Sequence, residues 1–193
     1  MDFVLATFNA DKARELGALL AAPGRRLLRL SDFQGATAPE ETGGSLLENA
    51  RLKARAAARH TGLAAIADDT GLEVDALDGA PGHLAARFAG PEGDSAANLA
   101  LLLERLRGVP AERRTARFRT VCVACFPDGR ESVGEGALAG RIAAGPRGHG
   151  GFGYDPVFEV AGMGRTLAEL DEAEKNALSH RARAVLALAR QLP

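Results

Sequence analysis

Two adjacent acids follow a short apolar segment of the chain. Asp68 and Asp69 come directly after residues 64–67, which are all apolar and are predicted to form a buried strand that ends at the acids. Adjacent carboxylates repel one another unless a cation or a proton relieves them. Mg²⁺ favours such hard oxygen ligands, usually together with substrate phosphates, and one carboxylate can then activate water. The alternative is a solvated turn in which one Asp caps the next segment.

A second pair of acids, Glu40 and Glu41, lies in a polar loop that precedes a predicted helix. These side chains are a further source of oxygen ligands for a divalent cation. Ser45 and Glu48 have the spacing of a capping box, so the helix is expected to begin near Ser45.

Thr7, Asn9 and Lys12 lie where the first predicted strand turns into a helix. Backbone N–H groups and the positive end of the helix dipole converge at such a turn, which favours phosphate. Lys12 belongs to a set of only three lysines, with Lys53 and Lys175, among 24 basic residues. Because lysine is a compact point charge suited to phosphate, each one is a candidate for a chemical role. The alternative is that Asn9 caps the helix and Lys12 is solvated.

The C-terminal third of the chain holds further candidates. Lys175 and Arg181 lie about 240° apart on a helical wheel, so one straight helix cannot direct both at one ligand. We therefore predict a break near Ser179, which places His180 and Arg181 at the start of a final helix. Tyr154 is the only tyrosine and lies in a glycine-rich loop, where its ring would stack on a base or anchor the core.

The elements that position these residues alternate between strand and helix over the first half of the chain. A hairpin, residues 115–126 and 131–143 around a turn at 127–130, follows and is predicted to form a second lobe. The expected class is α/β, with a mixed central sheet flanked by helices. Further predicted strands are residues 2–7, 26–30, 72–77 and 157–160, and predicted helices cover 13–20, 45–60, 94–106 and the stretch from 166 to 192.

Composition and motifs exclude several other classes of protein. With 24 basic and 25 acidic residues and no run of like charges, the 193-residue chain lacks the basic face that duplex nucleic acid requires. Its apolar stretches are too short to cross a bilayer, and residues 1–5 do not resemble a signal peptide, so we expect no membrane partner and a cytoplasmic location. Gly148, Gly150 and Gly153 match a dinucleotide-binding pattern, but Pro156 follows where a helix should begin. Cys122 and Cys125 would point to opposite faces of a strand, so they cannot easily pair, and we expect them to be buried thiols.

Five motifs, taken together, resemble the non-canonical purine nucleoside triphosphate pyrophosphatases, also called the inosine triphosphatase or Ham1-like family. They occur in order over almost the whole chain, and all three lysines lie within them. The motifs are Thr7-Phe8-Asn9-Ala10-Asp11-Lys12, Glu40-Glu41-Thr42-Gly43 with Glu48-Asn49-Ala50 and Lys53, Asp68-Asp69-Thr70-Gly71-Leu72, Phe152-Gly153-Tyr154-Asp155-Pro156, and Glu174-Lys175-Asn176-Ala177 with Ser179-His180-Arg181.

The resemblance implies a single domain, residues 1–193, with two lobes and an active-site cleft, in a cytoplasmic homodimer. It implies Mg²⁺-dependent hydrolysis of ITP, dITP and XTP to the monophosphate and pyrophosphate. Asp69 would be the general base and a metal ligand, and Glu40 the other metal ligand, although the choice between Glu40 and Glu41 stays open. The residues implied to bind substrate are Thr7, Phe8, Asn9, Ala10, Asp11, Lys12, Lys53, Thr70, Phe152, Gly153, Tyr154, Asp155, Lys175, His180 and Arg181, the last two mainly at the base.

Three positions depart from the family pattern. Phe8 stands where many relatives have Gly, Thr70 where many have Ser, and Ala85 where Ser is common. Two other functions stay open: a nucleotide-binding regulator without hydrolysis, and a house-cleaning pyrophosphatase for modified pyrimidine nucleotides. A panel of nucleotides with product analysis separates the three.

Overall fold

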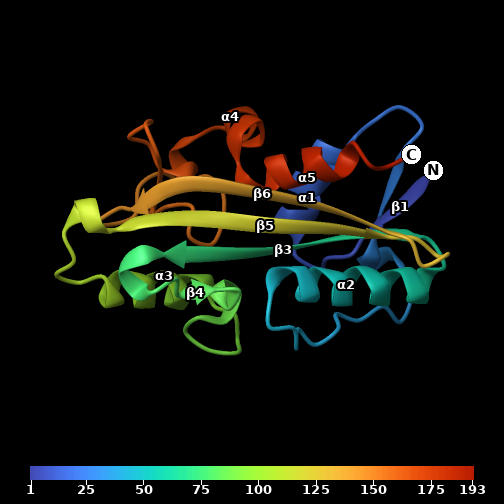
Figure 1. The fold of residues 1–193 in the computed structure, drawn as a ribbon, viewed down its shortest axis with the longest axis horizontal. Coiled ribbons are helices and arrows are strands. Elements are labelled where there is room, and N and C mark those ends of the chain that lie inside the picture. The colour runs from blue at the N-terminus through green and yellow to red at the C-terminus, as the bar shows by residue number, and fades with distance from the viewer. The chain divides into compact units, whose positions relative to one another are not determined.

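The computed structural model describes all 193 residues and has five α-helices and a seven-stranded sheet (Figure 1). The sheet is mixed: β1 pairs in parallel with β2 and β3, whereas β4 pairs antiparallel with β3 and β7 with β6. The predicted α/β class is therefore confirmed. The elements are β1 (Asp2–Leu5), α1 (Ala10–Leu20), β2 (Arg26–Arg29), α2 (Leu46–Thr61), β3 (Ala64–Val74), β4 (Pro81–Gly82), α3 (Ser95–Arg105), β5 (Thr115–Cys125), β6 (Glu131–Ile142), β7 (Phe158–Val160), α4 (Glu172–Leu178) and α5 (His180–Ala189).

The chain divides into two compact units. Unit 1 comprises Met1–Asp69, Thr120–Gly136 and His180–Pro193, and unit 2 comprises Thr70–Arg119 and Ala137–Ser179. The β5–β6 hairpin contributes its turn end to unit 1 and its other end to unit 2. The prediction that this hairpin forms a lobe of its own is therefore wrong.

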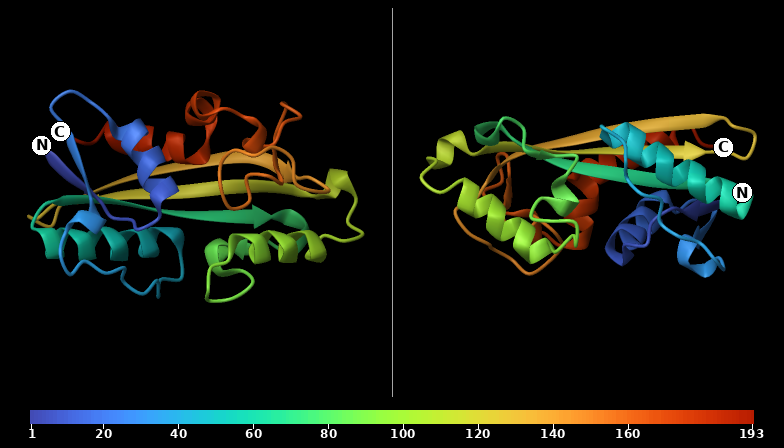
Figure 2. Two further views of the ribbon diagram at one scale, coloured as in Figure 1. Left: turned by 180° about the vertical axis from the view of Figure 1, so that it is seen from behind. Right: turned by 90° about the horizontal axis from the view of Figure 1, so that it is seen from below.

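Unit 1 has helices on both faces of its strands (Figures 1 and 2). Alternate residues of β1 and β3 enter two different apolar clusters: Phe3 and Ile66 pack with α1 and α5, whereas Val4 and Ala65 pack with α2. This alternation follows from the two-residue period of a strand. It explains why β1 after Asp2 and the start of β3 are apolar, as parallel strands covered on both faces are.

Unit 2 packs around a separate apolar core. Leu72 of β3, Leu102 of α3 and Phe158 of β7 are fully buried in it. The rings of Phe118 and Phe158 lie 4.6 Å apart between centroids. No helix in either unit has the length and apolarity to cross a bilayer.

Strand β3 continues through the two adjacent acids. We predicted a strand that stops at Asp68, but Ala64–Val74 is extended without interruption. A strand can continue through two acids because successive side chains point to opposite faces. Here Asp68 meets Lys12 on one face, and Asp69 meets Lys53 on the other. The continuous strand therefore places Asp68 and Asp69 in different surroundings.

The break predicted in the C-terminal helical stretch is confirmed. Ser179 has extended backbone angles, φ −65° and ψ 158°, and separates α4 from α5. Cys122 and Cys125, which we expected on opposite faces of their strand, belong to different apolar clusters. Burial raises the pKa of the Cys125 thiol to about 12, so it stays protonated at neutral pH.

Helix α2 depends on a cap that a single substitution removes. The Ser45 side chain accepts a hydrogen bond from the Glu48 backbone N–H at 3.2 Å. We expect Ser45→Ala to lower the free energy of unfolding by about 1 kcal/mol, because that N–H loses its partner. Ser95→Ala is the matched control: Ser95 is exposed at the first position of α3, where Asp94 caps instead. Urea denaturation of both variants measures the difference, and equal losses would show that the Ser45 hydroxyl does not act as a cap.

Candidate active site

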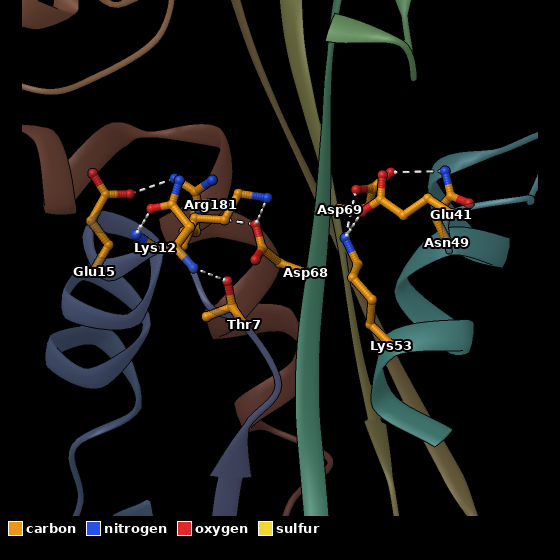
Figure 3. Close-up of polar contacts among 10 residues, drawn as sticks. Thr7, Lys12, Glu15, Glu41, Asn49, Lys53, Asp68, Asp69 and Arg181 are labelled. Atoms are coloured by element: carbon orange, nitrogen blue, oxygen red, sulfur yellow. Dashed lines mark hydrogen bonds and ion pairs between the residues drawn. The ribbon is translucent and has the colours of Figure 1, made fainter. Parts of the chain in front are cut away.

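Asp68 faces α1 and α5 from the middle of β3. Its Oδ2 atom lies 3.1 Å from the Arg181 Nε and 3.4 Å from the Lys12 Nζ (Figure 3). Arg181 also pairs with Glu15 of α1 through its Nη1 atom. Two cations and two carboxylates thus lie together, and the Arg181 and Asp68 side chains are at most 2% exposed.

Asp69 faces the other side of β3, toward α2. The Lys53 ammonium group donates to the Asp69 Oδ1 at 2.8 Å and to the Glu41 Oε1 at 2.9 Å (Figure 3). Asn49, one turn before Lys53 on α2, donates to the Asp69 Oδ2 at 3.4 Å, and its own oxygen accepts from the Gly43 N–H at 2.9 Å. The loop that carries Glu41 is therefore tied to α2 beside Asp69.

Charge and burial act against each other at these groups. Burial raises the pKa of Asp69, although Lys53 and Lys12 oppose the rise. Burial also raises the pKa of Asp68, but Lys12, Arg181 and Lys53 outweigh this effect and hold that pKa well below its usual range. Burial lowers the pKa of Lys12, whereas for Lys53 the neighbouring carboxylates overcome burial and raise it. Adjacent aspartates therefore differ: Asp68 stays ionised, and Asp69 is the better proton acceptor.

The turn between β1 and α1 is held by hydrogen bonds to two of its own side chains. The Asn9 side chain caps α1 by accepting from the Lys12 N–H at 2.9 Å, and the Thr7 Oγ1 accepts from the Asn9 N–H at 3.1 Å. Phe8 is 47% exposed. Helix α1 begins at Ala10, and Asp11 pairs with Arg14 at 2.8 Å on the exposed side. Asn9 is therefore the cap that one interpretation expected, whereas Lys12 faces Asp68. Phosphate binding at this turn stays a prediction.

Unit 2 contains a second group of predicted residues. The Asp155 Oδ2 accepts from the Lys175 Nζ at 2.7 Å and from the Phe152 N–H at 2.9 Å. The Lys175 ammonium group also lies 4.9 Å from the centre of the Phe152 ring. The structure therefore brings these three predicted residues together, and the buried lysine orients an aromatic face.

The remaining predicted residues have different surroundings. Tyr154 is 6% exposed in the core of unit 2, and its hydroxyl donates to the Ala85 carbonyl at 2.8 Å, so its ring anchors the core, as one of the two interpretations has it. Gly153 has a positive φ of 63° within the same loop. Thr70 is partly buried on β3 next to Asp69, and His180 is buried at the start of α5.

Glu41 and Asp69, the carboxylates that contact Lys53, are suited to be the protein ligands of a magnesium ion. No three His, Cys, Asp or Glu side chains cluster as a complete cage. However, Glu41 and Asp69 already hold a cation between them, the Lys53 ammonium. Mg²⁺ in nucleotide enzymes binds through one or two carboxylates plus substrate phosphates, which matches this pair. Glu40 is exposed one residue away, and its role as a ligand stays a prediction.

The sequence did not lead us to predict Glu15 as a residue of the site. It is buried and pairs with Arg181. A signal was available: Glu15 is three residues after Lys12 and four residues before Leu19, which packs against the core, so it shares a helical face with both. An acid on such a face requires a cationic partner.

The profile of the Ham1 family matches residues 3–191. The chain belongs to the Ham1 family. Among its relatives, the dITP/XTP pyrophosphatase of Thioalkalivibrio sulfidiphilus is 53% identical over all of this chain and 98% of the relative. The dITP/XTP pyrophosphatase of Geobacillus kaustophilus is 49% identical over 98% of this chain and 93% of the relative.

Solved structures of Ham1 proteins have the same fold. The HAM1 protein of Coxiella burnetii superposes with a TM-score of 0.89 at 40% identity, over all of this chain and 98% of that one. The nucleoside-triphosphatase and dITP/XTP pyrophosphatase of Mycobacterium abscessus superposes with a TM-score of 0.77 at 48% identity, over the whole of both chains.

The burial of Arg181 between two carboxylates has a consequence for stability. We expect Arg181→Ala to lower the free energy of unfolding by roughly 3–5 kcal/mol, because Asp68 and Glu15 lose their shared partner inside the protein. Arg190→Ala, at an exposed position just after α5, is the control and should stay within about 0.5 kcal/mol of the parent. Urea denaturation of the two variants measures both values. A loss below about 1 kcal/mol for Arg181→Ala would contradict the buried pairing.

Proposed function

We propose that this Ham1 protein is a nucleoside triphosphate pyrophosphohydrolase that converts ITP, dITP and XTP to the monophosphate and pyrophosphate. The observation that carries the proposal is the placement of Asp69 against Lys53 and Glu41 on one face of β3. A base with a raised pKa, a phosphate-binding cation and a ligand for a metal are thus in contact. The names of relatives that span the whole chain support the same activity.

The reaction transfers the α-phosphoryl group of the nucleotide to water. Asp69 accepts a proton as the water oxygen attacks the α-phosphorus, and the bond from that phosphorus to the bridging oxygen breaks. Pyrophosphate leaves with the electron pair of that bond. Lys12 and Lys53 hold phosphate oxygens as point charges, and the positive end of the α1 dipole adds to their attraction.

Charge balance is a reason to expect a divalent cation. The groups around β3 include three cations, Lys12, Lys53 and Arg181, and four carboxylates, Glu15, Glu41, Asp68 and Asp69. A triphosphate therefore meets a slight excess of negative charge. Mg²⁺ held by Asp69 with Glu41 or Glu40 would reverse that balance and stabilise the negative charge that develops on the phosphates. Hydrolysis of the nucleotide should accordingly stop when a chelator removes divalent cations and resume when Mg²⁺ is added.

The family resemblance implies that two groups of residues recognise the base. In unit 2, Phe152 presents a ring on which a purine can stack, but stacking accepts every base. Hypoxanthine and xanthine carry an O6 acceptor and an N1–H donor, whereas adenine reverses both. Donors from His180 or Arg181 at O6 would therefore be left unpaired by adenine, which discriminates by up to about 10⁴-fold. The extra 2-amino group of guanine must be excluded by the wall of the pocket.

Two further parts of the proposal rest on the sequence analysis and on no contact in the structure. We infer that the protein works as a homodimer and that it is cytoplasmic, where the nucleotide pool is. Its role there would be to remove non-canonical purines before they are incorporated.

The role of Asp69 is tested by Asp69→Asn. We expect at least about a 10²-fold loss in kcat, because the amide can neither accept the proton nor bind the metal as a carboxylate does. Asp128→Asn is the control, since Asp128 lies in the exposed β5–β6 turn and pairs only with Arg130. Circular dichroism checks that both variants fold. Near-parental turnover by Asp69→Asn would contradict the role of Asp69 as general base and metal ligand.

The proposed activity itself is tested with a panel of nucleotides. Purified protein with Mg²⁺ is given ITP, XTP, dITP, ATP, GTP and dTTP, and phosphate and pyrophosphate are measured separately. We expect pyrophosphate, with kcat/KM for ITP and XTP far above that for ATP and GTP. Binding without turnover would identify the regulator instead, and preferential turnover of dTTP, the pyrimidine of the panel, would favour the house-cleaning enzyme for pyrimidine nucleotides. Equal efficiency on ATP and ITP would refute the proposed base recognition.

A further inference from the structure

Two glycines on β6 let helix α5 lie directly on the strand. Gly134 and Gly136 are two residues apart, so they share one face of β6, the face along which α5 runs (Figures 1 and 2). A Cβ atom at Gly134 would lie 2.2 Å from the Ala184 carbonyl oxygen, and one at Gly136 would lie 2.2 Å from the His180 carbonyl oxygen. Both distances are far below ordinary contact, so neither position has room for a side chain.

Neither glycine is needed for its backbone angles. Both lie within a regular strand and outside the set of glycines with positive φ. Glycine weakens a strand, because it adds backbone entropy and has no side chain to pack. What these positions require is the close approach of the helix backbone.

The two contacts differ in what they position. Gly134 meets α5 at Ala184 and Leu188, within a part of the helix that packs in the apolar core. Gly136 meets it one turn earlier, at His180 and Ala184, where the helix begins. His180 is the first residue of α5, and the next residue, Arg181, carries the pairs with Asp68 and Glu15.

We propose that Gly136 is a positioning residue for base discrimination, because its lack of a side chain determines where His180 and Arg181 lie. This inference rests on the proposed function, in which those two residues recognise the base. Gly134 supports the same helix without determining the position of its first turn.

A methyl group at position 136 has a defined geometric effect. The atoms that it meets are mainly backbone atoms of α5, which no side-chain rotation can remove. The first turn of the helix must therefore move by about 1 Å, a displacement that can cost about 10²-fold where groups must be aligned. The Arg181 Nε to Asp68 hydrogen bond, at 3.1 Å, would change in length or angle.

The experiment compares Gly136→Ala with Gly134→Ala, two identical changes with equally close overlaps. For the parent and both variants, kcat/KM is measured for ITP and for ATP, and inorganic pyrophosphate is used as a competitive inhibitor. We expect both variants to lose urea stability to a similar extent. Gly136→Ala should lower the ITP-to-ATP ratio by at least about tenfold, whereas Gly134→Ala should keep it within about twofold. The inhibition constant of pyrophosphate should stay near the parental value in both variants, because phosphate is proposed to bind at the turn between β1 and α1 rather than at α5.

Loss of stability alone does not change the ratio of kcat/KM for ITP to kcat/KM for ATP. Both substrates are assayed on one preparation, so the fraction of folded enzyme cancels, and a stabilising osmolyte at low temperature keeps a weakly folded variant measurable. An unchanged ratio in Gly136→Ala, or equal changes in both variants, would overturn the inference while leaving the proposed function intact. A parent that releases no pyrophosphate from any purine nucleotide would overturn the proposed function, and this inference with it.

Discussion

The chemistry of this protein depends on one property of an extended strand, the alternation of its side chains. Asp68 and Asp69 are covalent neighbours, yet β3 directs one toward α1 and α5 and the other toward α2. Each carboxylate then acquires its own cations, and their proton affinities shift in opposite directions. If the strand ended at Asp68, both acids would share one solvated turn, and neither would differ from an ordinary carboxylate. The helices on the two faces of β3 are therefore parts of the site as well as of the core.

Most of the elements follow from local patterns, whereas the continuity of β3 does not. Apolar spacing and the Ser45 cap predicted α2 closely, and the angular separation of Lys175 and Arg181 predicted the break at Ser179. Local rules treat a run of polar residues as the end of a strand, because an isolated strand cannot compensate buried acids. Here the compensation comes from residues 12, 53 and 181, which are distant in sequence. The same limit applies to the hairpin, whose division between two units depends on tertiary contacts.

The site was predictable where composition singled residues out. Each of the three lysines kept in an arginine-rich chain contacts a carboxylate: Lys12 at Asp68, Lys53 at Asp69, and Lys175 at Asp155. Burial was not predictable in the same way. Charge pattern alone does not reveal that Arg181 is enclosed with Glu15, or that the Tyr154 ring anchors a core, since both facts depend on how α1, α5 and the glycine-rich loop pack. Residue type indicated the chemistry, and packing decided which atoms are accessible to it.

The Lys53 ammonium between Glu41 and Asp69 has a consequence for how the protein matures. In domains built around structural zinc, unbalanced ligands keep the chain unfolded until the ion arrives. Here the carboxylates that would face a metal are already compensated by a side chain of the same polypeptide. Folding would therefore not require the proposed metal, and a newly made chain could complete its native structure in a compartment poor in divalent ions.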